Sequence, residues 1–307
     1  MADPKKLVLL TGGNSGIGLE ACKILCSKGY TVVASVRSDE KGDSMVSAVR
    51  ASNSAADIHY MICEMADPES IRTFADEFKK KWLVGGRRLD VLVNNAGAIY
   101  DYPERQVADV NPEWEKTMIV NALGPITLTD LFVDDLKETA LEKGDARVVM
   151  VNSSITTMMT WMFKEQIDFD DVMLSKPGAY KSSQQTYKLS KMALMMATLA
   201  LSEELQDTSV KFNSICPGLI PGTNISNNRQ SQRGTAYKIM FGLLAMMMGK
   251  SNLDGGQFIV NAADGTQGTT RGMFYVRDKL TSPNPQVAVA DNQRRMLKIL
   301  RDLAKSV

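Results

Sequence analysis

Short hydrophobic runs alternate along the chain with longer segments in which hydrophobic and polar residues follow a helical period. The runs are nearly continuous rather than alternating, which is typical of strands in a parallel sheet covered on both faces. The clearest predicted strands are residues 7–10, 31–36, 58–63, 89–94, 147–151 and 210–215. A weaker run at 257–260 is expected to complete a seventh strand.

The intervening segments read as amphipathic helices. Residues 68–82 begin with Pro68 and place Ile71, Phe74 and Phe78 on one side, with charged residues opposite. Residues 286–305 show the same spacing. This strand–helix alternation predicts an α/β fold with a doubly wound, Rossmann-type parallel sheet of about seven strands and helices on both faces. No repeat or linker interrupts the pattern, so one domain is expected over residues 1–307.

A glycine-rich turn joins the first predicted strand to the first helix. Gly12, Gly16 and Gly18 have the spacing G-x-x-x-G-x-G. Glycines allow a sharp turn and bring the bare backbone close to a pyrophosphate, which the helix N-terminus then attracts. This position in an alternating chain predicts dinucleotide binding. The other turn residues expected to line the cofactor are Asn14, Ser15 and Ile17.

The end of the second strand predicts which dinucleotide is bound. An acidic residue there would accept hydrogen bonds from the adenosine ribose and repel a 2′-phosphate. This chain instead has Arg37, whose guanidinium matches a phosphate in charge and geometry. The sequence therefore favours NADP(H) over NAD(H).

Two tyrosine–lysine pairs have a spacing that would place both side chains on one helix face: Tyr187 with Lys191, and Tyr275 with Lys279. Either pair could be a proton donor with its activating cation or simply two polar residues. Tyr187 follows the fifth strand and begins a long helical pattern, whereas Tyr275 comes after all six clear strands. Position therefore favours Tyr187 and Lys191 as the functional pair.

Composition excludes several classes of function. The chain is 44% hydrophobic and 23% charged with a formal net charge of +1, so neither nucleic acid nor an anionic membrane is expected as the main partner. A single histidine and four cysteines without a C-x-x-C motif predict no metal site. Neither a signal peptide nor an apolar run long enough to span a membrane is found, so a cytoplasmic protein is expected.

Six motifs in order resemble the short-chain dehydrogenase/reductase family across nearly the whole chain. They are "TGGNSGIG" (11–18), "NNAG" (94–97), "VNALGP" (120–125), "VNSS" (151–154), "YKLSK" (187–191) and "CPG" (216–218). The stretch before Tyr187 and the helical C-terminal region are most similar to the retinol-dehydrogenase-like and protochlorophyllide-reductase-like branches.

The resemblance implies hydride transfer between a nicotinamide and a carbonyl or alcohol. Tyr187 would donate the proton, and the Lys191 cation would favour its phenolate form and lower its pKa. Asn121 would hold a water that links Lys191 to solvent. Counting from Arg147 along the fifth strand, the serine that orients the substrate oxygen falls at Ser153, with Ser154 as the alternative.

Further cofactor contacts follow from the same motifs. Family precedent also has Lys191 contact the nicotinamide ribose, beside Tyr187. Glu64 stands where the family usually has an aspartate against adenine. The backbone positions expected to line the cofactor are Asn94, Ala96, Gly97, Pro217 and Gly218.

The substrate is predicted to be a small, lipophilic molecule. An active-site insertion at about 155–185 and a substrate loop at about 219–250 are rich in methionine and aromatic residues, which suit an irregular apolar pocket or simple packing. The stretch 239–249 could be a lid, an interface or a membrane contact. Two other functions stay open: reduction of a C=C bond, and a catalytically silent NADP-binding regulator. Family habit predicts a homo-oligomer.

Overall fold

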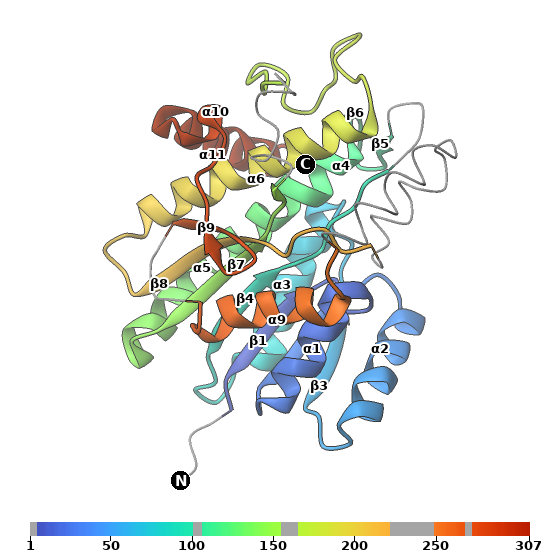
Figure 1. Ribbon diagram of the computed structural model, residues 1–307, viewed down its shortest axis with the longest axis vertical. Coiled ribbons are helices and arrows are strands. Elements are labelled where there is room, and N and C mark those ends of the chain that lie inside the picture. The colour runs from blue at the N-terminus through green and yellow to red at the C-terminus, as the bar shows by residue number, and fades with distance from the viewer. Residues whose placement is uncertain (1–4, 101–105, 155–164, 222–248, 268–271) are drawn as a thin grey trace.

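An eight-stranded, mostly parallel sheet forms the centre of the protein, in the order β10-β9-β8-β7-β4-β1-β2-β3 (Figure 1). The computed structural model describes residues 5–100, 106–154, 165–221, 249–267 and 272–307. Neighbouring strands of the sheet are parallel except for β10, which pairs antiparallel with β9. The predicted doubly wound α/β fold is thus confirmed.

The strands of this sheet are β1 (Leu7–Thr11), β2 (Thr31–Val36), β3 (Ile58–Ile62), β4 (Leu89–Asn94), β7 (Ala146–Val151), β8 (Val210–Cys216), β9 (Met273–Val276) and β10 (Lys279–Leu280). A separate two-stranded antiparallel sheet consists of β5 (Val107–Ala108) and β6 (Asn111–Glu115). The helices are α1 (Gly16–Ser27), α2 (Asp39–Ser52), α3 (Pro68–Trp82), α4 (Lys116–Met118), the π-helix η1 (Ile119–Leu123), α5 (Gly124–Lys143), α6 (Ser183–Glu204), α9 (Asn252–Asp264), α10 (Pro285–Ala288) and α11 (Ala290–Lys305).

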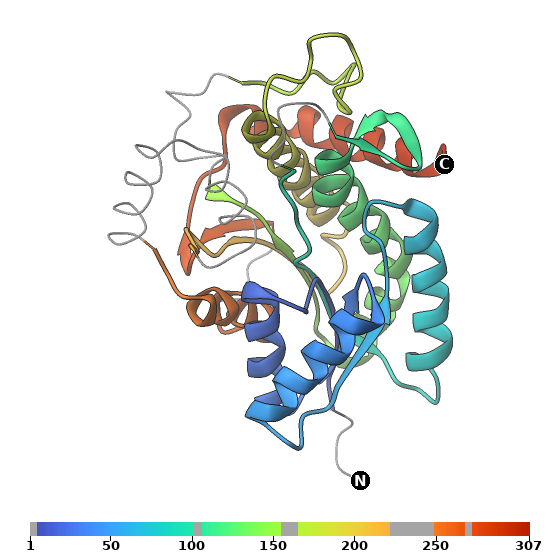
Figure 2. The same cartoon turned by 90° about the vertical axis from the view of Figure 1, so that its right-hand side faces the viewer.

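Helices cover the sheet on both faces (Figure 2). One face packs against α1, α2 and α9, and the other against α3, α5 and α6, with α11 lying outside α6. Residues of the central strands enter both cores: Val149 packs on the α1 side and Val148 on the α5 side. Both cores need apolar side chains, which explains why the strands read as continuous hydrophobic runs.

The predicted strand at 257–260 is wrong, because these residues lie in α9. A short apolar run does not distinguish a buried strand from a buried helix turn. Ser251 and Asp254 form a capping box that starts this helix. Gly256 lets the helix approach α1 so closely that an added Cβ would lie 2.7 Å from Glu20 Cβ. The seventh parallel strand is β9, and β10 extends the sheet beyond it.

The C-terminal segment also differs from its prediction. The single helix expected at 286–305 is divided into α10 and α11 by an extended residue, Val289, with ψ 116°. Tyr275 and Lys279 lie on the paired strands β9 and β10, so they do not share a helix face. The second tyrosine–lysine pair is therefore a coincidence of spacing.

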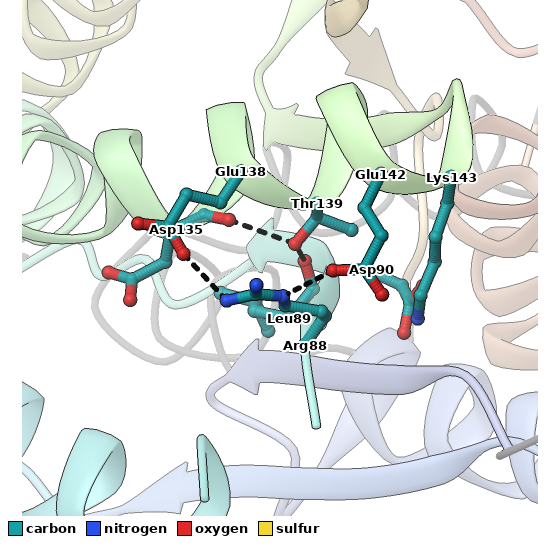
Figure 3. A network of polar contacts seen from close by, with 8 residues as sticks. All are labelled: Arg88, Leu89, Asp90, Asp135, Glu138, Thr139, Glu142 and Lys143. Atoms are coloured by element: carbon teal, nitrogen blue, oxygen red, sulfur yellow. Dashed lines mark hydrogen bonds and ion pairs between the residues drawn. The ribbon is translucent and has the colours of Figure 1, made fainter. Parts of the chain in front are cut away.

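A network of polar contacts joins the start of β4 to the end of α5 (Figure 3). Arg88 forms ion pairs with Glu138 and Glu142, and Lys143 Nζ lies 2.8 Å from the buried Asp90 carboxylate. Thr139 Oγ1 donates to the Leu89 carbonyl. These contacts hold β4 and α5 together at the edge of the sheet opposite the glycine turn.

No helix in the described part of the chain is long and apolar enough to cross a membrane.

Candidate active site

The glycine turn leaves β1 and enters α1 at the carboxyl edge of the sheet. Gly12 and Gly16 have φ values of +70° and +55°, which side chains rarely tolerate. An added Cβ at Gly18 would lie 2.3 Å from the Gly12 carbonyl oxygen. Ser15 is extended and makes no side-chain cap, and the first turn of α1 has no acidic residue. The first N–H groups of α1 thus face a cradle suited to an anion.

Two residues that sequence reasoning missed brace this turn. Asn95 Nδ2 donates to the carbonyl oxygens of Thr11 (2.8 Å) and Gly12 (3.1 Å). Thr11 Oγ1 accepts from the N–H groups of Asn95 and Ala96. The second asparagine of "NNAG", which follows β4 directly, is the sequence feature that could have indicated this contact. Asn94 points instead toward α5, where its Nδ2 donates to Thr129 Oγ1.

We expect Gly18→Ala to weaken dinucleotide binding. The new methyl group would overlap the Gly12 carbonyl and Asn95 Nδ2, and overpacking of this kind costs about 1–3 kcal/mol. If the turn must open to relieve that strain, the Kd of the reduced dinucleotide rises about tenfold to a hundredfold, measurable by fluorescence titration. Gly29→Ala is the matched control: its φ is +85° but no atom lies within 4 Å of the added Cβ. Equal Kd values for the two variants would contradict the prediction.

Arg37, Glu64 and Tyr100 lie together at the outer end of this edge. Arg37 follows β2 and is exposed, while Glu64 follows β3 and accepts a hydrogen bond from the Ala66 N–H with Oε1. Partial burial and the Glu64 carboxylate raise the pKa of the Tyr100 phenol, and the Arg37 guanidinium opposes this rise. Tyr100 is thus near both charged side chains, and it is an addition to the sequence prediction.

Tyr187 and Lys191 lie on the first turns of α6 and are buried. Lys191 Nζ is 6.0 Å from the centre of the Tyr187 ring and donates to the Val151 carbonyl at 2.9 Å. Burial lowers the pKa of the Lys191 ammonium from 10.5 to about 8, and the nearby Cys216 side chain opposes the shift. Lys191 therefore lies at the ends of β7 and β8, on a helix that follows the fifth predicted strand.

Asn121 lies in η1, is fully buried and faces Lys191 across Gly97. Its Oδ1 accepts from the Ala98 N–H (2.8 Å), and its Nδ2 donates to the Ala98 carbonyl and to Ser190 Oγ. Ser190, which sequence reasoning missed, donates in turn to the Tyr187 carbonyl. An added Cβ at Gly97 would lie 3.3 Å from Asn121 Oδ1 and 3.5 Å from Lys191 Nζ. Gly97 thus keeps open the space between the two side chains.

The segment 152–154 leaves the end of β7 beside the turn at 217–218. The Ser153 N–H donates to Asn152 Oδ1, and the Ser154 N–H donates to Cys216 Sγ. Ser153 is partly exposed and Ser154 is buried. Pro217 and Gly218 follow β8 directly, and Gly218 has φ +91°.

The regions expected to contact the substrate are described only in part. Residues 155–164 of the predicted insertion lie outside the described residues, as does the Met-rich stretch 239–249 except for Gly249. The described part of the insertion is held to α6 and α10 by polar contacts. Lys188 Nζ lies 2.8 Å from Glu165 Oε2, and Gln286 exchanges two hydrogen bonds with the Ile167 backbone.

Sequence comparison finds one family and a set of curated relatives. A family model described as short chain dehydrogenase matches residues 6–164. The chain is 31% identical to human polyprenol dehydrogenase over 219 residues, 33% identical to mouse retinol dehydrogenase 12 over 217, and 31% identical to short-chain dehydrogenase TIC 32 B, chloroplastic, of Brassica napus over 222. Each alignment covers 71% of this chain but only 61–65% of the relative.

Solved structures share the fold at low sequence identity. A crystal structure of an uncharacterised protein from Mycobacterium paratuberculosis superposes with a TM-score of 0.70 at 21% identity, over 99% of this chain and 96% of the other. An actinorhodin polyketide ketoreductase variant with NADPH gives 0.66 at 19% identity, over 89% and 95%. An NADPH-bound short chain oxidoreductase from Pseudomonas aeruginosa gives 0.64 at 20%, over 89% and 96%.

Proposed function

Because the chain belongs to the short-chain dehydrogenase family of oxidoreductases, we propose that it transfers a hydride between NADP(H) and the carbonyl or alcohol of a lipophilic substrate. The observation that carries this proposal is the placement of Lys191. Its ammonium is buried beside Tyr187, hydrogen-bonded to the end of β7 and separated from Asn121 by the open space at Gly97. Among the described residues no carboxylate pairs with this ammonium, and burial of an unpaired cation is costly, which favours a chemical role over a silent regulator.

The residues of the glycine turn fit a dinucleotide. An added Cβ would lie 3.0 Å from Ala96 Cα at Gly12 and 2.3 Å from the Gly12 carbonyl oxygen at Gly18, and the N-terminus of α1 offers its first N–H groups to a pyrophosphate. Arg37 would hold the adenosine 2′-phosphate, and Glu64 and Tyr100 would border the adenine. When bound, the cofactor supplies or accepts the hydride.

Tyr187 would move the proton. In the reductive direction its hydroxyl donates to the substrate oxygen as negative charge develops there. The Lys191 ammonium stabilises the resulting phenolate. Ser153, at the partly exposed position of its segment, would hold the same oxygen by a hydrogen bond, with Ser154 as the alternative. Asn121 would hold a water, in the space left by Gly97, that links Lys191 to solvent.

Two relatives support a lipophilic substrate, because polyprenol and retinol dehydrogenases are named for long apolar alcohols. The test is NADPH consumption by the purified protein against aldehydes, ketones and quinones of increasing chain length. We expect turnover that rises with substrate apolarity, with an alcohol as the product. A saturated C–C bond with the carbonyl intact would support C=C reduction instead, and no consumption with any substrate would refute the proposal.

Cofactor preference should reverse in Arg37→Asp. A charge-assisted hydrogen bond to phosphate contributes about 1.5–3 kcal/mol, so kcat/KM with NADPH should fall about tenfold to a hundredfold. The carboxylate would accept hydrogen bonds from the ribose, so activity with NADH should rise. Arg50→Asp, at an exposed arginine in the last turn of α2, makes the same charge change and is the control. An unchanged NADPH/NADH ratio in Arg37→Asp would contradict the assignment.

A cytoplasmic location and a homo-oligomeric assembly stay predictions of the sequence. Fractionation of cells that express the protein measures its location. Gel filtration with light scattering measures the oligomeric state directly.

A further inference from the structure

The sulphur of Cys216 lies at the end of β8 and accepts two backbone hydrogen bonds. Cys216 is 2% exposed. Its Sγ is 3.0 Å from the Ser154 nitrogen and 3.3 Å from the Gly218 nitrogen. Its carbonyl oxygen accepts from the Arg277 N–H at 2.7 Å. One residue therefore connects the chain segments that follow β7, β8 and β9, which are neighbours in the sheet (Figure 1).

The Cys216 sulphur continues the hydrogen bonding between the β7 and β8 segments beyond the last paired residues of the two strands. The strands pair as far as Val151 and Ile215, and the Asn152 N–H then donates to the Ile215 carbonyl at 2.6 Å. The Ser154 N–H is buried and needs an acceptor, and Cys216 Sγ is that acceptor.

These contacts surround the proposed catalytic serine. Ser153 lies between Asn152 and Ser154, whose N–H groups are both held by β8 residues. Lys191 Nζ donates to the Val151 carbonyl, so α6 holds the same segment from the other side. The Cys216 side chain is also near enough to Lys191 to oppose the effect of burial on its pKa.

We propose that Cys216 is a positioning residue of the active site: through the Ser154 and Gly218 N–H groups, its sulphur orients Ser153 and holds the turn at 217–218. This role rests on the proposed oxidoreductase function. The sulphur acts through the backbone and does not contact the substrate.

Three variants test the acceptor role: Cys216→Ala, Cys216→Ser and the control Cys26→Ala. Alanine removes the acceptor, whereas serine keeps one in a slightly shorter side chain. Because displacement of a catalytic group by about 1 Å can cost about a hundredfold in rate, kcat in Cys216→Ala should fall about tenfold to a hundredfold. KM for the carbonyl substrate should change far less, and Cys216→Ser should recover most of kcat. Cys26, buried toward the far end of α1, should affect Tm alone.

Amide hydrogen exchange of the protein without cofactor gives a readout independent of turnover. The Ser154 and Gly218 amides should exchange at least about tenfold faster in Cys216→Ala, should be protected again in Cys216→Ser, and should be unchanged in Cys26→Ala. The inference is overturned if Cys216→Ala loses Tm but keeps both kcat and amide protection, or if serine restores neither. If the amides respond as expected but the wild-type protein reduces no carbonyl, the proposed function fails and the role of the sulphur in holding the two segments stands.

Discussion

Tyr187→Phe is expected to lower kcat for carbonyl reduction by about a hundredfold to ten-thousandfold, the range for loss of a positioned general acid. The substitution removes one hydroxyl from a buried ring and leaves the contact between that ring and Lys191 in place. NADPH binding should therefore be preserved, since the glycine turn and Arg37 are untouched. Steady-state kinetics with the best carbonyl substrate, together with a fluorescence titration of NADPH, measure both quantities.

Tyr275→Phe is the matched control for this experiment. Tyr275 is as buried as Tyr187, at 7% exposure, and belongs to the second tyrosine–lysine pair, but it lies on β9. We expect its turnover to stay within about threefold of the wild type, because this ring has no place in the proposed proton transfer. Full activity in Tyr187→Phe, or an equal loss in both variants, would mean that another group donates the proton.

Lys191→Met is expected to lower activity and raise stability at the same time. Methionine fills a similar volume without a charge. Activity should fall by at least about a hundredfold, because the phenolate loses its stabilising cation. Stability at pH 7 should rise, because the folded protein no longer buries an ammonium that has no carboxylate partner among the described residues.

The pH dependence of this effect has a definite sign. Burial lowers the Lys191 pKa to about 8 in the folded protein, below its ordinary value of 10.5. Below about pH 8 both the folded and unfolded forms carry the proton, and the folded form bears the full cost, about 3 kcal/mol at about 1.4 kcal/mol per pKa unit. Between about pH 8 and 10.5 only the unfolded form keeps the proton, so the wild type gains stability relative to Lys191→Met as pH rises.

Thermal unfolding of the cofactor-free proteins at several pH values measures this difference. Loss of the hydrogen bond to the Val151 carbonyl offsets about 1 kcal/mol, so a net gain of about 2 kcal/mol is expected at pH 7. Lys188→Met provides the contrast: Lys188 is equally buried but paired with Glu165, so its removal should lower Tm. A lower Tm in Lys191→Met, independent of pH, would show that the buried charge is not a cost.

Sequence by itself determined six strands of the sheet, the glycine turn and the place of Tyr187 and Lys191 on one helix after β7. A strand that is covered on both faces needs an unbroken hydrophobic run. A turn with φ values of +70° and +55° needs glycine. Each feature can therefore be recognised from a few adjacent residues. The tyrosine at 187 was distinguished from the one at 275 by its order among the strands. These features depend on local residue patterns and on the order of elements along the chain, and both can be read from the sequence.

Tertiary structure decided the features whose partners are far apart along the chain. Residues 257–260 are helical in the structure, because Gly255 and Gly256 at the start of α9 let this helix pack closely against α1. Asn121 meets Ser190 across 69 residues, and Ser154 meets Cys216 across 62. These contacts exist because the sheet order places β7 beside β8 and because a π-helix turns Asn121 inward. Hydrogen-bond partners of buried groups are chosen by such packing, since every buried donor must find an acceptor in the space that the fold provides.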